Sequence, residues 1–197
     1  MAKQGAQDTI AQFNSILRDI RARQFKPVYL FMGEEPYYSD ILVDELLATV
    51  LKPEERDFNQ TIVYASDTNT AEIVSLARRY PMFAERQLVV VKEAQSLTKL
   101  DVLELYLQSP APETVLVLAY TGKSVDKRSG FYKKAKSVAE VFESSMLAEW
   151  KVAEWIVTYV KGKGLHIAND AASLMAEHTG NSLRKIVLEI DKLIKGI

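Results

Sequence analysis

The sequence contains no cysteine and only two histidines among its 197 residues. Without cysteine, the chain can form no disulfide, no zinc–thiolate site and no cysteine nucleophile, and it suits a reducing compartment. His166 and His178 are too far apart for the H-x-x-x-H pair that binds zinc from one helix. We expect His166 in a loop and His178 at a helix end, and we expect no metal site.

Long hydrophobic runs are also missing. No apolar stretch approaches the length of a membrane-spanning helix, and the N-terminal residues lack the apolar core of a signal peptide. We therefore expect a cytoplasmic protein without a membrane partner. With a net charge of −1, the protein is not expected to bind nucleic acid over its whole surface. A basic patch on one face is still compatible with this net charge.

Short apolar runs alternate with helical patterns over the first part of the chain. An amphipathic helix is predicted over residues 7–24. The expected strands are residues 27–33, 58–64, 88–91, 114–120 and 139–143, and the expected helices between them are 37–50, 70–80, 97–109 and 129–136. Strands separated by helices of this length predict an α/β fold, a parallel sheet with helices on its faces.

The pattern becomes purely helical at about residue 144. Three helices are expected, over residues 148–161, 170–179 and 182–194. Gly180 suits a helix C-cap, with Asn181 or Ser182 as the next N-cap. We therefore predict an α/β domain over residues 1–143 and a three-helix domain over residues 144–197. Because three helices bury little alone and the last reaches the final residue, we expect a fragment of a longer protein.

A phosphate-binding loop would follow the first strand, at Gly33. The pattern G-x-x-x-x-G-K-[ST] would need glycine, lysine and a hydroxyl where the chain has Tyr38, Ser39 and Asp40. Glu34 and Glu35 would also place negative charge where a triphosphate approaches a helix N-terminus. The segment "TGKS" at 121–124 fails as well, since Val117 stands where its first glycine should be. We expect neither nucleotide binding nor any cofactor.

Other catalytic patterns are missing too. The sequence has no G-x-S-x-G elbow, and the carboxylate pair Glu54–Glu55 lies in an expected turn, where solvated charge is the simplest interpretation. No motif converges on a catalytic site, so we do not expect an enzyme.

A basic segment spans residues 123–136. A solvated helix and loop is its simplest interpretation. The alternative is a patch for DNA phosphates or for an acidic neighbour, in which Phe131 and Tyr132 would be core residues rather than base-stacking ones. The candidate DNA contacts are Lys123, Lys127, Arg128, Lys133 and Lys134.

Two large apolar residues, Met82 and Phe83, fall on the connection between the helix 70–80 and the strand 88–91. Pro81 disfavours helical angles at Tyr80, so the helix should end there. Two apolar neighbours on a loop cannot easily both face the core, so at least one of them is a candidate contact for a partner.

Four segments in order resemble one known family. They are "PVYLFMGEEPYYSDILVDEL", "PMFAERQLVVVKEAQSL", "PETVLVLAYTGKSVDKR" and "GNSLRKIVLEIDKL", and together they resemble the delta subunit of the bacterial DNA polymerase III clamp loader. The resemblance covers roughly residues 20–197. It implies an AAA+-type domain with a degenerate phosphate-binding loop, a three-helix lid domain and a third, collar domain that is missing here.

The resemblance also implies a function without hydrolysis of ATP by this chain. Family members bind and open the ring-shaped sliding clamp with an apolar pair, which corresponds to Met82 and Phe83; many relatives have leucine at the first position. Arg86 and Gln87 match the same motif as candidate rim contacts. The implied partners are the clamp, the other clamp-loader subunits and, through the assembled complex, primed-template DNA. The alternatives are a DNA-binding adaptor that uses the basic segment and an ATP-hydrolysing AAA+ subunit.

Overall fold

The computed structural model describes residues 2–196, with side chains described from residue 9, and divides into two compact units. The larger unit comprises residues 8–144; the smaller comprises residues 145–197 together with residues 1–7. Among the described residues, no helix is long and apolar enough to cross a membrane.

The larger unit is built on a five-stranded sheet in the order β2-β3-β4-β1-β5. Its strands are β1 (Val28–Gly33), β2 (Gln60–Tyr64), β3 (Gln87–Lys92), β4 (Thr114–Ala119) and β5 (Glu140–Ser144). Every neighbouring pair runs parallel; Gln60 pairs with Leu88 and Val28 with Leu116. The predicted parallel α/β fold is therefore confirmed, and β2 forms an edge of the sheet.

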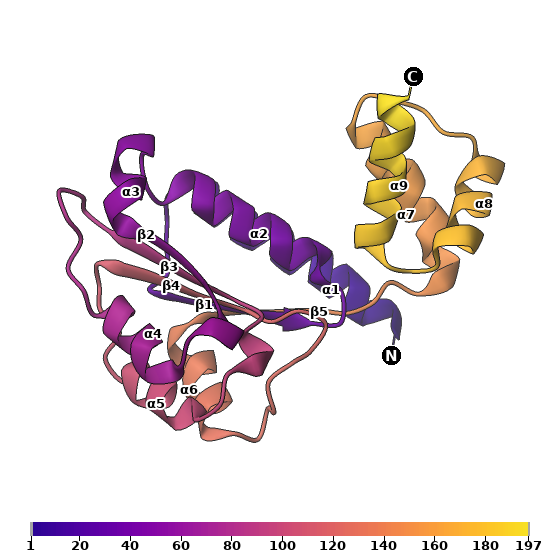
Figure 1. Ribbon diagram of the computed structural model, residues 1–197. Helices are drawn as coiled ribbons and strands as arrows, with labels where there is room; N and C mark the ends of the chain where they lie inside the picture. Colours follow the sequence, from indigo (N-terminus) through magenta and orange to yellow (C-terminus); the bar gives the residue numbers. More distant parts are fainter. Residues whose placement is uncertain (1, 197) are drawn as a thin grey trace. The chain divides into compact units, whose positions relative to one another are not determined.

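Helices cover both faces of this sheet (Figure 1). One face carries α1 (Ala2–Arg21) and α2 (Pro36–Thr49), and the opposite face carries α4 (Thr70–Ala77), α5 (Leu100–Tyr106) and α6 (Gly130–Val138). The central strands are buried on both sides, as their continuous apolar runs predict. The short helix α3 (Arg56–Asn59) directly precedes β2, and three single 3-10 turns, η1 (Pro53–Glu55), η2 (Ala65–Asp67) and η3 (Ala94–Ser96), complete the connections.

Two predicted boundaries next to the candidate site are wrong. The predicted strand 58–64 begins only at Gln60, because Phe58 and Asn59 form the end of α3. The predicted helix 70–80 ends at Ala77, and Tyr80, which its spacing placed on the apolar face, is 83% exposed. The segment between α4 and β3 is therefore longer than the sequence pattern indicates.

The smaller unit contains α7 (Glu149–Gly162), α8 (Asn169–Thr179) and α9 (Leu183–Lys195). Helix α8 packs against both α7 and α9. Gly180 ends α8 at a positive φ of 69°, as expected for a helix C-cap, and Ser182 is the N-cap residue of α9. The buried apolar side chains of this unit recur at helical spacing and include Val152, Ile156, Val160, Leu183, Ile186 and Ile190.

Candidate functional site

The segment between α4 and β3 presents the two apolar side chains that the sequence singled out. Phe83 is 97% exposed and Met82 is 52% exposed. An apolar side chain stabilises the fold through the surface that it buries. A phenylalanine as exposed as Phe83 therefore contributes almost nothing to the stability of the fold. The geometry therefore leaves the Phe83 ring available to a partner.

The backbone at Phe83 adopts an unfavourable conformation. Its φ is +55°, in the left-handed region that glycine adopts readily and that a residue with a large side chain adopts at a cost of about 1 kcal/mol. A phenylalanine at this position strains the backbone and exposes its ring. Both features are costly for the isolated chain, which favours an explanation in binding rather than in folding.

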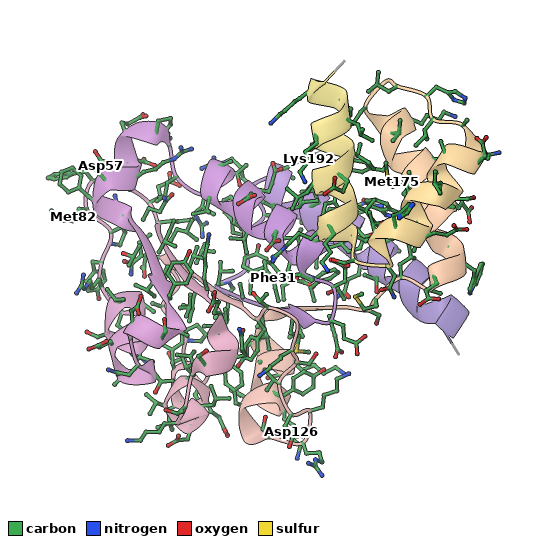
Figure 2. All side chains as sticks on the ribbon, turned by 45° about the vertical axis from the view of Figure 1, so that its right-hand side comes forward. Phe31, Asp57, Met82, Asp126, Met175 and Lys192 are labelled. Atoms are coloured by element: carbon green, nitrogen blue, oxygen red, sulfur yellow. The ribbon has the colours of Figure 1, made fainter. Side chains whose placement is uncertain are left out.

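Asn59, the last residue of α3, holds the loop. Its side-chain amide accepts a hydrogen bond from the backbone N–H of Met82 (2.6 Å) and donates one to the carbonyl of Met82 (2.9 Å). The same nitrogen donates to the carbonyl of Glu55 at 2.9 Å. Asn59 is only 3% exposed, so these bonds fix Met82 to the beginning of β2 in a largely water-free environment. Figure 2 shows Asp57, on α3, beside Met82.

Gln87 does not suit the rim contact that the sequence resemblance implies, because its side chain is only 7% exposed. Its amide nitrogen lies within hydrogen-bonding distance of the Leu76, Ala77 and Arg79 carbonyls at the end of α4 and of the Thr114 hydroxyl on β4. Gln87 therefore anchors the end of the loop and does not face a partner. This is a correction to the expected role.

Arg86 remains a candidate for a rim contact. Its side chain is half-buried, and its guanidinium lies 5.8 Å from the centre of the Phe25 ring. Arg23 lies 5.7 Å from the same ring. Stacking of this kind holds a guanidinium in place without neutralising its charge, so Arg86 can still pair with an acidic group of a partner.

The degenerate phosphate-binding loop is closed by the protein's own groups. The Gly33 N–H donates to the Lys123 carbonyl (2.9 Å), and the Glu34 N–H donates to the Ser144 carbonyl (3.0 Å). At the beginning of α2, the fully buried Glu35 carboxylate accepts a hydrogen bond from the Tyr37 N–H (2.9 Å). Three backbone donors near the expected phosphate position are therefore already paired within the protein.

Gly33 also packs tightly against β5. Its φ is +120°, and a Cβ atom added there would lie 2.0 Å from the Ser144 carbonyl oxygen. The loop therefore approaches the neighbouring backbone closely on the side away from solvent, and the glycine serves that contact. Tyr38 and Ser39, which replace the glycine and lysine of the phosphate-binding pattern, are both buried on α2.

The basic segment is partly neutralised. Lys127 forms an ion pair with Glu143 (2.6 Å), and Arg128 pairs with Asp126 through two hydrogen bonds of 3.1 Å. The bond to Glu143 raises the pKa of the Lys127 ammonium, and the bonds from Arg128 lower the pKa of the Asp126 carboxyl. Lys123 and Lys133 are exposed, and Lys134 is half-buried.

The aromatic residues of this segment belong to the core. Phe131 is 2% exposed, and Tyr132 packs against the cluster beneath α4, α5 and α6. The interpretation of both as core residues is confirmed: Phe131 is fully buried, and the half-buried Tyr132 packs against the same cluster.

The histidines lie where the sequence placed them. His166 is in the segment between α7 and α8, and His178 is in the last turn of α8; both are exposed. Within the part of the chain that the structure describes, no group of three or more His, Asp or Glu residues could hold a metal ion.

Comparison with known proteins assigns the chain to a family. Residues 29–145 match the family described as "DNA polymerase III, delta subunit". The chain belongs to the DNA polymerase III delta subunit family. The matched residues include the closed loop at Gly33, the Met82–Phe83 segment and the basic segment, and they correspond to almost all of the sheet.

Individual relatives agree with this assignment. DNA polymerase III subunit delta of Bacillus subtilis (strain 168) is 28% identical in an alignment of 188 positions that covers 90% of this chain and 54% of the relative. The solved structure of the Bacillus subtilis DNA clamp loader delta protein (YqeN) superposes with a TM-score of 0.71 at 27% identity, covering 92% of this chain and 56% of that one. The chain thus spans about half the length of these relatives.

A more distant structure shows how widely the fold is shared. The Thermotoga maritima RuvB Holliday junction branch migration motor superposes with a TM-score of 0.54 at 13% identity, covering 93% of this chain and 59% of that one. At this identity the likeness concerns the fold alone. Together with the delta structure, it confirms the predicted AAA+-type fold.

Proposed function

We propose that this delta-family chain acts in a clamp loader by binding the DNA sliding clamp and favouring its open state. The exposed, backbone-strained Phe83 carries the proposal. Its ring, together with the Met82 side chain, would insert into an apolar pocket of the clamp. Methionine suits the first position because its flexible, unbranched side chain fills irregular apolar spaces.

The mechanism would use binding energy instead of a chemical step. A protein shifts the equilibrium of a ring between closed and open states only by the difference between its affinities for the two. The Asn59 bonds hold the loop in one conformation before binding, which reduces the ordering cost that binding must overcome. More of the interaction free energy is then available to favour the open ring.

Nucleotide would act through partner subunits. In this chain the backbone donors near Gly33 are already paired and Glu35 lies at the beginning of α2, an arrangement unfavourable to a bound triphosphate. We propose that the chain is not itself an enzyme, that the three-helix unit serves as the lid domain, and that primed-template DNA is reached through the assembled complex.

The Phe83→Ala variant tests the proposal against purified sliding clamp. Truncation of an interface anchor typically costs about 2 kcal/mol or more of binding free energy, or roughly 30-fold in affinity. Truncation of an exposed side chain usually changes the free energy of unfolding by about 0.5 kcal/mol or less. The proposal therefore expects a large loss of affinity with little change in stability. Unchanged affinity for the clamp would refute it.

A further inference from the structure

Phe58 is an exposed aromatic residue that neither the sequence patterns nor the proposed function explains. It lies on the short helix α3 and is 69% exposed. The chain has seven phenylalanines, all within the described side chains, and Phe58 and Phe83 are the two that are exposed; the other five are buried or half-buried. The exposure of Phe58 therefore departs from how the protein places its other phenylalanines.

The fold brings the segments of Phe58 and Phe83 to the same end of the sheet. Helix α3 leads directly into β2, and the Met82–Phe83 loop leads into β3, the parallel neighbour of β2. Both segments therefore meet at the amino ends of adjacent strands. In Figure 2, Asp57 of α3 and Met82 of the loop are both labelled at this end of the sheet.

A direct contact joins the two segments. Asn59, the residue after Phe58, bonds both the N–H and the carbonyl of Met82, the residue before Phe83. Each exposed ring is thus one residue away from the same pair of hydrogen bonds. Movement of one segment relative to the other would break those bonds, so the segments that carry the two rings are held together.

We propose that Phe58 is a third apolar anchor of the clamp-binding surface and contacts the same sliding clamp as Met82 and Phe83. The inference rests on the function proposed above. The shared partner follows from continuity, because a pocket that admits Phe83 must approach the segment that Asn59 ties to it.

The surroundings of the three side chains fit a protein interface. Asp57, Arg79 and Glu85 are exposed charged residues of the same two segments. An apolar centre with a charged, solvated rim is the usual arrangement where two proteins associate. A contact of this kind contributes to affinity through buried apolar surface, so its contribution should depend only weakly on salt.

The Phe58→Ala variant tests this inference by affinity measurements with purified clamp, at low and at moderate salt. We expect about tenfold weaker binding at both salt concentrations, with an unchanged melting temperature. Phe58→Leu, which keeps an apolar side chain, should retain most of the affinity. Leu105→Ala is the matched control. Leu105 is similarly exposed, at 62%, but it lies on α5 and not on α3 or the Met82–Phe83 loop.

Phe83→Ala, measured in parallel, separates the two proposals. If Phe83→Ala weakens binding and Phe58→Ala binds as tightly as the unaltered chain, the inference about Phe58 is overturned and the proposed function stands. If neither variant loses affinity, both are overturned. A lowered melting temperature for Phe58→Ala, with full affinity of the folded protein, would assign Phe58 to the fold and would also overturn the inference.

Discussion

The side-chain amide of Asn59 holds the backbone of Met82 from both sides, with its oxygen 2.6 Å from the Met82 nitrogen and its nitrogen 2.9 Å from the Met82 oxygen. These two bonds join residues 23 positions apart in the sequence. They tie the exposed loop to a buried position beside the edge strand. The loop's conformation therefore depends on a residue that does not itself face a partner.

Asn59→Ala should weaken clamp binding although the Asn59 side chain is buried. The change removes three hydrogen bonds and should lower the free energy of unfolding by about 1–3 kcal/mol. The folded protein should also bind the clamp more weakly, since the loop must then be ordered during binding. Affinity measured well below the melting temperature checks this expectation. Asn181→Ala, which removes one amide bond to Leu147 in the helical unit, is the control.

Gln87→Ala should act on stability more than on recognition. The buried amide bonds the end of α4, and its loss removes the donor to the Arg79 carbonyl. The Leu76 carbonyl keeps a bond from the Arg79 N–H and the Ala77 carbonyl keeps one from the Thr114 hydroxyl, so we expect a cost of about 1–2 kcal/mol in the free energy of unfolding. Chemical denaturation measures this cost, and Gln108→Ala, at an exposed position, should leave the transition unchanged. If Gln87→Ala is instead as stable as the unaltered chain but binds the clamp more weakly, Gln87 contacts the clamp at the rim of the interface.

The chain should not bind ATP, and replacement of the missing lysine should not restore binding. Ser39→Lys would place a charged side chain at a position that is 3% exposed, so it should destabilise the fold. The paired donors at Gly33 and Glu34 would still be occupied. Calorimetry with magnesium and ATP checks both proteins. Micromolar affinity in either would contradict the account of the closed loop.

Lys133→Ala should leave clamp affinity within about 0.5 kcal/mol, because the residue lies on α6 and its loss removes only exposed charge. If the basic segment instead contacts DNA, the same change should reduce the slope of log affinity against log salt by about 0.9 for duplex DNA. Parallel titrations of the unaltered and altered chains, with clamp and with duplex, distinguish the two roles. A strong loss of clamp binding would show that the interface extends to α6.

The sequence predicts the sheet well because its signal is local. Continuous apolar runs such as 114–120 mark strands buried on both faces, and the helices between them require parallel pairing. The Met82–Phe83 loop was also predictable, since Pro81 and the apolar pair are adjacent in the chain. The sequence predicts where this loop lies in the fold. That the loop binds the clamp stays a prediction.

The supporting residues could not be predicted in the same way. Asn59 was included in an expected strand, because alternation from Phe58 to Tyr64 resembles one, and its bonds to Met82 are tertiary contacts. Asparagine is uncommon in strands, which was the one available signal. The burial of Gln87 and the exposure of Phe58 depend on neighbouring segments of the fold, which residue spacing does not reveal.

The clamp affinity of Phe83→Gly, measured beside its thermal unfolding, tests the central claim most directly. Glycine tolerates the φ of +55° at this position, so the free energy of unfolding should stay unchanged or rise by up to about 1 kcal/mol. Affinity for the clamp should fall by roughly 30-fold or more, because the exposed ring is lost. A variant that melts at the same or a higher temperature and binds poorly is the predicted result. A variant that keeps full clamp affinity would contradict the account.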